Sequence, residues 1–291
     1  MQLPNNAATN GWYNVLPDPT PARQVSGTIR APYVVLGAGV TGLSAARQLA
    51  THLPDEQIVL IEAERVGFGT SGRNSGFALD SFFQGDEPLN NPELSAAHAR
   101  LCTGGLNILR NLVKENEIEC GWHDWGKLHV SAGAEGDASL KGFIKGYETL
   151  GIQAQELNAD EVAAVTGSTF YTAGLKVEAT GLMNPAAMCR GLGETLPSNV
   201  TLYENTPVHR LERGQPSRLI TAHGEVIADH LIMCTNVFSP ALGFSKSDMV
   251  PVVAYASLTR PMTALEQAEI GGDANGFGLL PAARGGSTVR R

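Results

Sequence analysis

One short segment, Gly37-Ala38-Gly39-Val40-Thr41-Gly42, limits most strongly what this chain can fold into. It directly follows the continuously apolar run 33–36 and directly opens residues 40–53, whose apolar side chains have helical spacing. A buried strand, a glycine-rich turn and a helix in this order begin a dinucleotide-binding unit. The first glycine permits the tight turn, the second lets the backbone approach a pyrophosphate, and the third lets the helix pack on the strand. The candidate ligand-binding residues here are Gly37, Ala38, Gly39, Thr41 and Gly42.

An acidic residue stands where such a unit needs one. Residues 57–61 read as a second buried strand, and Glu62 follows it, twenty residues beyond Gly42. A carboxylate at this place accepts hydrogen bonds from the hydroxyls of an adenosine ribose and repels a 2′-phosphate. The site is therefore expected to prefer FAD or NAD over NADP.

A second glycine-rich stretch, Arg65-Val-Gly-Phe-Gly-Thr-Ser-Gly-Arg-Asn-Ser-Gly76, comes soon after Glu62. An NAD-binding unit has no standard need for such a loop. On this stretch and the fingerprint before it, the sequence resembles the D-amino-acid oxidase superfamily of FAD-dependent oxidoreductases. Within that superfamily it is similar to the branch of glycine oxidase, sarcosine oxidase and γ-glutamylputrescine oxidase.

The resemblance implies FAD as the cofactor and adds site residues. In the family the matching loop runs beneath the flavin and contacts the pyrophosphate and the ribityl chain, a role that falls here to Ser71, Gly72, Arg73 and Asn74. Arg73 offers a forked donor to phosphate oxygens, and the glycines permit close passage under a flat ring. Two later matches imply that Val208 brackets the adenine through its backbone and that Thr235 closes the pyrophosphate side.

The strands and helices expected along the rest of the sequence predict an α/β fold with two domains, each built from separated segments. Strands are expected at 126–130, 171–177, 200–203, 208–212, 219–221, 231–234, 251–259 and 277–282. Helices are expected at 92–116, 140–150, 158–165 and 185–196, the last two with Asn158 and Asn184 as N-caps.

We thus expect three parts. Residues 1–30 are polar and interrupted by prolines, and form an N-terminal arm without a stable element. A Rossmann-like FAD-binding domain of the glutathione-reductase type takes 31–82 and 181–248. A mixed-sheet α+β substrate domain, incomplete at its C-terminus, takes 83–180 and 249–291.

Composition narrows the classes of partner. The net charge is -8, from 29 acidic and 21 basic residues, and no Lys/Arg block is present, which disfavours nucleic-acid binding. The apolar runs fall far short of the ~20 residues of a membrane span, and the start does not resemble a secretory signal, so a soluble cytoplasmic protein is expected. Four widely spaced cysteines without a CxxC pair, and seven histidines without HxH or HxxxH spacing, predict neither a metal site nor a disulfide framework.

For function, the resemblance implies oxidation of the C–N bond of a small amine or amino acid. Hydride passes to the flavin, the imine is hydrolysed, and dioxygen or another acceptor reoxidises the cofactor. Because this superfamily does not always require a side-chain base, no catalytic residue is assigned. His123, Asp124 and His129 would lie in the substrate domain, where a surface or core role is commoner than ligand contact.

Full-length relatives continue beyond a hairpin that we expect at 276–283 and 286–290. The chain is therefore expected to be a shortened copy that does not turn over amines at a family-like rate by itself. Two alternatives stay open. One is a non-catalytic nucleotide-binding remnant or interaction protein that keeps the ADP pocket. The other is a nicotinamide-dependent dehydrogenase, which the loop at 71–74 disfavours.

Overall fold

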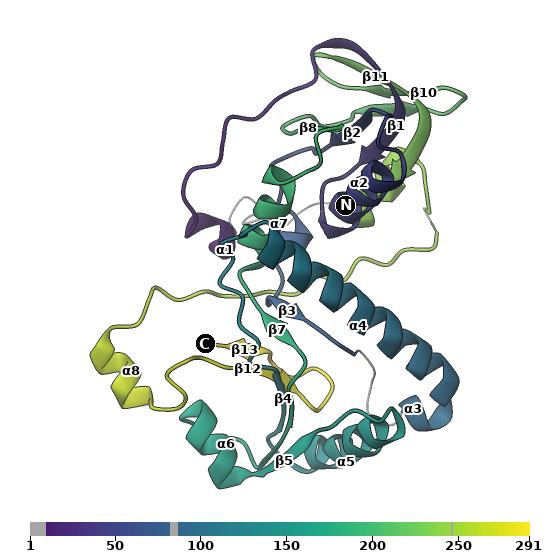
Figure 1. Ribbon diagram of the computed structural model, residues 1–291. Helices are drawn as coiled ribbons and strands as arrows, with labels where there is room; N and C mark the ends of the chain where they lie inside the picture. The colour runs from purple at the N-terminus through teal and green to yellow at the C-terminus, as the bar shows by residue number, and fades with distance from the viewer. Residues whose placement is uncertain (1–9, 82–86, 246) are drawn as a thin grey trace. The chain divides into compact units, whose positions relative to one another are not determined.

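The computed structural model describes residues 10–81, 87–245 and 247–291 (Figure 1). The chain divides into two compact units, each considered by itself. The first comprises the described residues up to Asn74 together with Glu115–Cys120 and Asn184–Ser257. The second comprises Ser75–Lys114, Gly121–Met183 and Leu258–Arg291. Each unit is therefore assembled from segments that lie far apart in the sequence.

The first unit is built on a six-stranded sheet with the order β8-β2-β1-β11-β10-β9. Its strands are β1 (Gly27–Leu36), β2 (Ile58–Ile61), β8 (Val200–Tyr203), β9 (Arg210–Glu212), β10 (Ser217–Ile220) and β11 (Gly224–Met233). β8, β2, β1 and β11 are parallel neighbours, while β9, β10 and β11 form an antiparallel meander. Counted along the chain, the parallel strands have the order 3-2-1-4 of a Rossmann unit. The predicted α/β, Rossmann-like fold class is confirmed.

Helix α2 (Val40–His52) packs on this sheet, against β1, β2 and β8. All four residues of β2 are buried, as expected of a parallel strand covered on both faces. The helices are α1 (Gly11–Asn14), α2 (Val40–His52) and α7 (Pro185–Glu194), with the 3-10 turns η1 (Thr70–Gly72) and η2 (Asn236–Leu242). The predicted N-cap of α7 is confirmed, because the Asn184 side chain accepts hydrogen bonds from two backbone N–H groups and Pro185 takes the first helical position.

The second unit holds a five-stranded mixed sheet with the order β13-β12-β4-β6-β5 and a two-stranded sheet of β3 and β7. Its strands are β3 (Phe77–Ala78), β4 (Lys127–Ser131), β5 (Gln155–Asn158), β6 (Ala173–Val177), β7 (Gly181–Leu182), β12 (Gly278–Pro281) and β13 (Val289–Arg290). Its helices are α3 (Glu87–Asn90), α4 (Pro92–Glu115), α5 (Ala134–Thr149), α6 (Ala159–Thr166) and α8 (Ala264–Ile270). β12 and β13 pair antiparallel, so the predicted hairpin is confirmed. None of the helices described is both long and apolar enough to cross a membrane.

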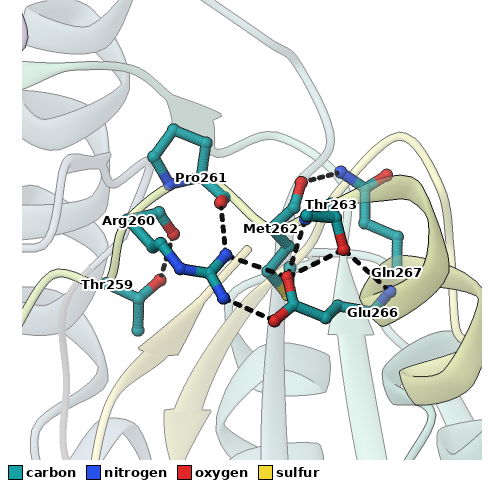
Figure 2. Close-up of polar contacts among 7 residues, drawn as sticks. All are labelled: Thr259, Arg260, Pro261, Met262, Thr263, Glu266 and Gln267. Carbon is teal, nitrogen blue, oxygen red and sulfur yellow. Dashed lines mark hydrogen bonds and ion pairs between the residues drawn. The ribbon is translucent and has the colours of Figure 1, made fainter.

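The start of α8 shows how local side chains fix a short helix (Figure 2). Thr263 and Glu266 form a capping box, in which each side chain accepts from the other's backbone N–H. Arg260 adds a bidentate ion pair with Glu266, in which Nη2 lies 2.6 Å from Oε1 and Nη1 lies 2.9 Å from Oε2. These contacts, the Arg260 pair first, lower the pKa of Glu266 to about 2. The capping hydrogen bonds and the ion pair at its first turn thus stabilise α8, a helix of only 7 residues.

Two sequence expectations are wrong. The segment 1–30 does contain regular structure, since α1 lies within it and β1 begins at Gly27. Ile29 and Ala31 in that strand pair with Val226 and Ala228 of β11, a long-range partner that local composition does not reveal.

Residues 251–259 are not a strand: they have no regular structure and every one of them is exposed. Their β-branched residues favour a strand, but a strand requires a paired neighbour.

A polar cluster is buried in the second unit around Lys127, which is 1% exposed. Its ammonium lies 2.7 Å from Asp80 Oδ1 and donates to Ser81 Oγ at 3.0 Å. Two residues further along β4, His129 Nε2 lies 3.0 Å from the Tyr147 hydroxyl. Burial, and then the charge of Lys127, lower the pKa of His129 to about 3, although Asp80 opposes the shift. His129 is therefore a neutral core histidine, whereas Asp124 is exposed and paired with Arg110.

We predict that His129 makes the fold sensitive to acid. In the unfolded chain its pKa returns to about 6.5, so the unfolded state binds the extra proton as the pH falls below that value. The contribution of His129 is complete above about pH 6.5, and below it the free energy of unfolding falls by up to about 1.4 kcal/mol per pH unit. His129→Gln keeps a polar partner for Tyr147 but cannot titrate. Urea unfolding should show a shallower decline for this variant between about pH 6.5 and 4.5.

His209→Gln, at an exposed position, is the surface control. Equal slopes for the parent and His129→Gln would contradict the assignment of a neutral buried imidazole.

Candidate cofactor-binding site

The glycine-rich turn between β1 and α2 is packed so tightly that side chains are excluded from it. Gly37 has a φ of +100°, and an added Cβ would lie 2.5 Å from the carbonyl oxygen of Cys234. A Cβ on Gly42 would lie 1.8 Å from the carbonyl oxygen of Gly37. The tight turn and the close contact of helix and strand, predicted for the first and third glycines, are thus present.

The second glycine faces the loop at 65–74. A Cβ on Gly39 would lie 2.8 Å from Ser71 Oγ, and that hydroxyl accepts a hydrogen bond from the Val40 N–H at 3.0 Å. The N–H groups of Thr41 and Gly42 belong to the first turn of α2, where a helix offers them no carbonyl partner. Together with the positive end of the helix dipole, they suit an anionic ligand such as a pyrophosphate.

Glu62 stands directly beside this turn. One carboxylate oxygen, Oε2, accepts from the Ala38 N–H at 2.8 Å, and the other, Oε1, accepts from the Glu64 N–H at 3.1 Å. Burial raises the pKa of Glu62, the N–H bonds oppose that shift, and the charge of Glu204 adds to it. A carboxylate has about four acceptor positions, so two donors leave room for ribose hydroxyls. The fixed acceptor fits the ribose of FAD or NAD.

The side chains of the loop at 65–74 mostly brace the loop itself. Arg73 Nε donates to the Phe68 carbonyl at 2.6 Å, and the guanidinium lies 4.6 Å from the centre of the Phe68 ring. Burial lowers the pKa of Arg73, while the charge of Glu64 raises it. Asn74 Nδ2 donates to the Ser71 carbonyl at 2.7 Å. Gly72 is buried and an added Cβ would lie 1.8 Å from the Gly67 carbonyl oxygen, so the loop folds back on itself.

The two later candidates lie close to two strands of the same sheet, Val208 before β9 and Thr235 after β11. Thr235 lies two residues beyond the end of β11, next to the end of β1, and its hydroxyl lies 2.8 Å from that of Ser239. Val208 is half-buried and packs on the core of the sheet, two residues beyond Thr206, whose N–H donates to the Glu62 carbonyl at 3.0 Å.

The fold therefore gathers the glycine turn, Glu62 and Ser71 at the carboxyl ends of β1 and β2. Two contacting residues lie outside the predicted set: Asn236 Nδ2 donates to Thr70 Oγ1 at 3.3 Å, which ties the loop to the end of β11. The hydroxyl-rich loop and the Thr-Asn pair after a strand were the available signals for this contact. The N–H groups of the first turn of α2, the Glu62 carboxylate and the close-packed glycine turn fit a dinucleotide such as FAD.

Comparison with known proteins agrees with this geometry. A protein-family model described as FAD dependent oxidoreductase (DAO) matches residues 32–289. The chain therefore belongs to the DAO family of FAD-dependent oxidoreductases.

Individual relatives are more distant. The chain is 27% identical over 244 residues to the probable oxidoreductase OrdL of Haemophilus influenzae, covering 80% of this chain and 56% of that protein. It is 28% identical over 216 residues to the gamma-glutamylputrescine oxidoreductase of Escherichia coli, covering 72% of this chain and 50% of that protein. Among solved structures, glycine oxidase from Geobacillus kaustophilus matches with a TM-score of 0.59 at 18% identity, covering 74% of this chain and 58% of the other. The chain thus spans about half the length of the curated relatives it matches.

We predict that either Gly39→Asp or Glu62→Arg abolishes FAD retention. The first places charge and bulk at the N-terminus of α2, and the second removes the carboxylate that accepts from Ala38. Flavin absorbance per mole of purified protein is the measurement. Glu56→Arg, at an exposed position before β2, is the matched control and should retain FAD. Unchanged flavin content in both site variants would refute the site.

We also predict that Arg73→Ala weakens FAD binding by about 1 to 3 kcal/mol, the range for a lost charge-assisted hydrogen bond, and leaves the fold intact. Arg73→Lys keeps the charge but loses the fork, so it should give an intermediate dissociation constant. The measurement is titration with FAD followed by fluorescence, with circular dichroism as the check on folding. A dissociation constant equal to that of the parent would show that Arg73 has no part in holding the cofactor.

Proposed function

We propose that this chain carries the FAD-binding domain and substrate-domain segments of an FAD-dependent oxidoreductase that oxidises the C–N bond of a small amine or amino acid. The observation that carries the proposal is the contact of Ser71 Oγ with the Val40 N–H, because it joins a flavin-type loop to the dinucleotide turn. Glu62, fixed by Ala38, supplies the ribose acceptor in the same place.

Each group in this site has a defined task. Thr41 and Gly42 direct N–H groups toward the pyrophosphate, and Gly39, which has no Cβ, leaves room for Ser71 Oγ beside the turn. Ser71, Gly72, Arg73 and Asn74 shape the surface beneath the ring system, while Val208 and Thr235 border the adenine and pyrophosphate ends. The first unit is the FAD-binding domain, and the second unit, with its mixed sheet, is the substrate domain.

A bound flavin would supply the chemistry, as the acceptor of a hydride from the carbon that bears the nitrogen. The protein's part is to position that carbon and to exclude water from it. Support for an amine or amino-acid substrate comes from two relatives, whose names are gamma-glutamylputrescine oxidoreductase and glycine oxidase. Imine hydrolysis and reoxidation by dioxygen or another acceptor complete the proposed cycle.

A two-stage experiment tests this function. The full chain is expressed and reconstituted in parallel with FAD, NAD and NADP, and retained nucleotide is measured after gel filtration. We expect FAD alone to be retained. The FAD-loaded protein is then mixed anaerobically with glycine, sarcosine, D-alanine, proline and γ-glutamylputrescine, with a 2-hydroxy acid as the control for C–O oxidation.

Bleaching of the flavin absorbance by at least one amine, at less than a family-like rate, is the expected result. Retention of NAD rather than FAD would contradict the cofactor assignment. Retention of FAD without bleaching by any amine would instead favour a non-catalytic nucleotide-binding protein.

A further inference from the structure

The N-terminal strap, residues 10–14, is a short segment that contains α1 and lies against the loop at 65–74. Asn10 at its start is 4% exposed, whereas asparagine residues are mostly exposed. Its carboxamide nitrogen donates to the carbonyls of Gly67 and Gly72, each at 3.2 Å, with Phe68 O at 3.5 Å. One side chain thus joins the two ends of the turn that carries Ser71.

Trp12 and Tyr13 of the strap also contact this loop. Trp12 Nε1 donates to the Asn74 carbonyl at 2.9 Å, at the far end of the loop. The ring of Tyr13 meets that of Phe68 edge-on, with centroids 5.7 Å apart. α1 lies beside α7 (Figure 1), and the N-cap of α7, Asn184, donates from Nδ2 to the Trp12 carbonyl at 3.1 Å.

The loop needs such support because most of it belongs to no strand or α-helix. Its carbonyl groups at Gly67 and Gly72 are buried, and a buried carbonyl without a donor costs free energy. Gly67 has a φ of +80°, and glycines have many alternative conformations to lose. The donors of the strap satisfy these carbonyls in the conformation in which Ser71 Oγ accepts from the Val40 N–H.

We propose that the strap holds the loop at 65–74 in its cofactor-binding shape and that Asn10 is a positioning residue for the FAD site. Asn10 acts indirectly, because its side-chain amide donates hydrogen bonds to the loop carbonyls of Gly67 and Gly72. The proposal rests on the function proposed above, since it concerns the same cofactor. It adds that FAD affinity depends on a segment that precedes the whole dinucleotide fingerprint in the sequence.

Asn10→Ala tests the proposal against a matched control. Asn199 also has an amide that bridges two carbonyls of the first unit, Leu53 O at 3.0 Å and Glu56 O at 3.1 Å, but away from the loop. Both variants are expected to lose similar thermal stability. Asn10→Ala should raise the FAD dissociation constant about tenfold, and Asn199→Ala should change it by less than about twofold. Trp12→Phe, which keeps the ring but loses the donor to Asn74, should raise it by about threefold.

Two results of this comparison would contradict the proposal. If Asn10→Ala and Trp12→Phe bind FAD as the parent does, the strap has no role in positioning the loop. If Asn199→Ala weakens FAD as much as Asn10→Ala, the effect is general destabilisation and the proposal is overturned. If Asn10→Ala does not fold, the comparison of Trp12→Phe with Asn199→Ala decides by the same criterion. A parent that does not bind FAD would refute the proposed function itself, which is a separate outcome.

Discussion

The hydrogen bond from the Val40 N–H to Ser71 Oγ is the contact on which the site depends, because it joins two segments that a simple dinucleotide unit would leave apart. Val40 belongs to the first turn of α2, where backbone donors are available, and Ser71 lies in the short turn η1. A Cβ on Gly39 would collide with the same hydroxyl. The absence of a side chain at Gly39 is therefore as necessary to this contact as the presence of one at Ser71.

The second constraint is electrostatic. Glu62 brings a carboxylate to the positive end of α2, and it is fixed there by N–H groups of Ala38 and Glu64. Burial raises the pKa of Glu62, so the N–H donors are needed to keep the charged form favourable. The proposed cofactor site thus combines the backbone N–H groups of one turn with the carboxylate of one side chain.

Local sequence predicted the parts of this site whose signals are short-range. The run at 33–36, the three glycines and Glu62 follow one another along the chain, and the structure places them as that order requires. The caps at Asn158 and Asn184 were likewise readable, because a capping side chain acts within three residues. The N-terminal half of β1 was not, since its partner β11 lies almost two hundred residues away. The sequence did not predict the strap for the same reason, because the contacts of Asn10 are long-range: Gly67 lies 57 positions and Gly72 lies 62 positions further along the chain.

The central claim is that the turn at 37–42 and the loop at 65–74 form one FAD-binding surface. Hydrogen–deuterium exchange of the full chain, measured with and without saturating FAD, tests it most directly. The account predicts that FAD slows exchange in peptides covering both segments and leaves β9 and β10 of the meander unchanged. FAD-dependent protection of the turn without any change in the loop, or no protection of either segment, would contradict it.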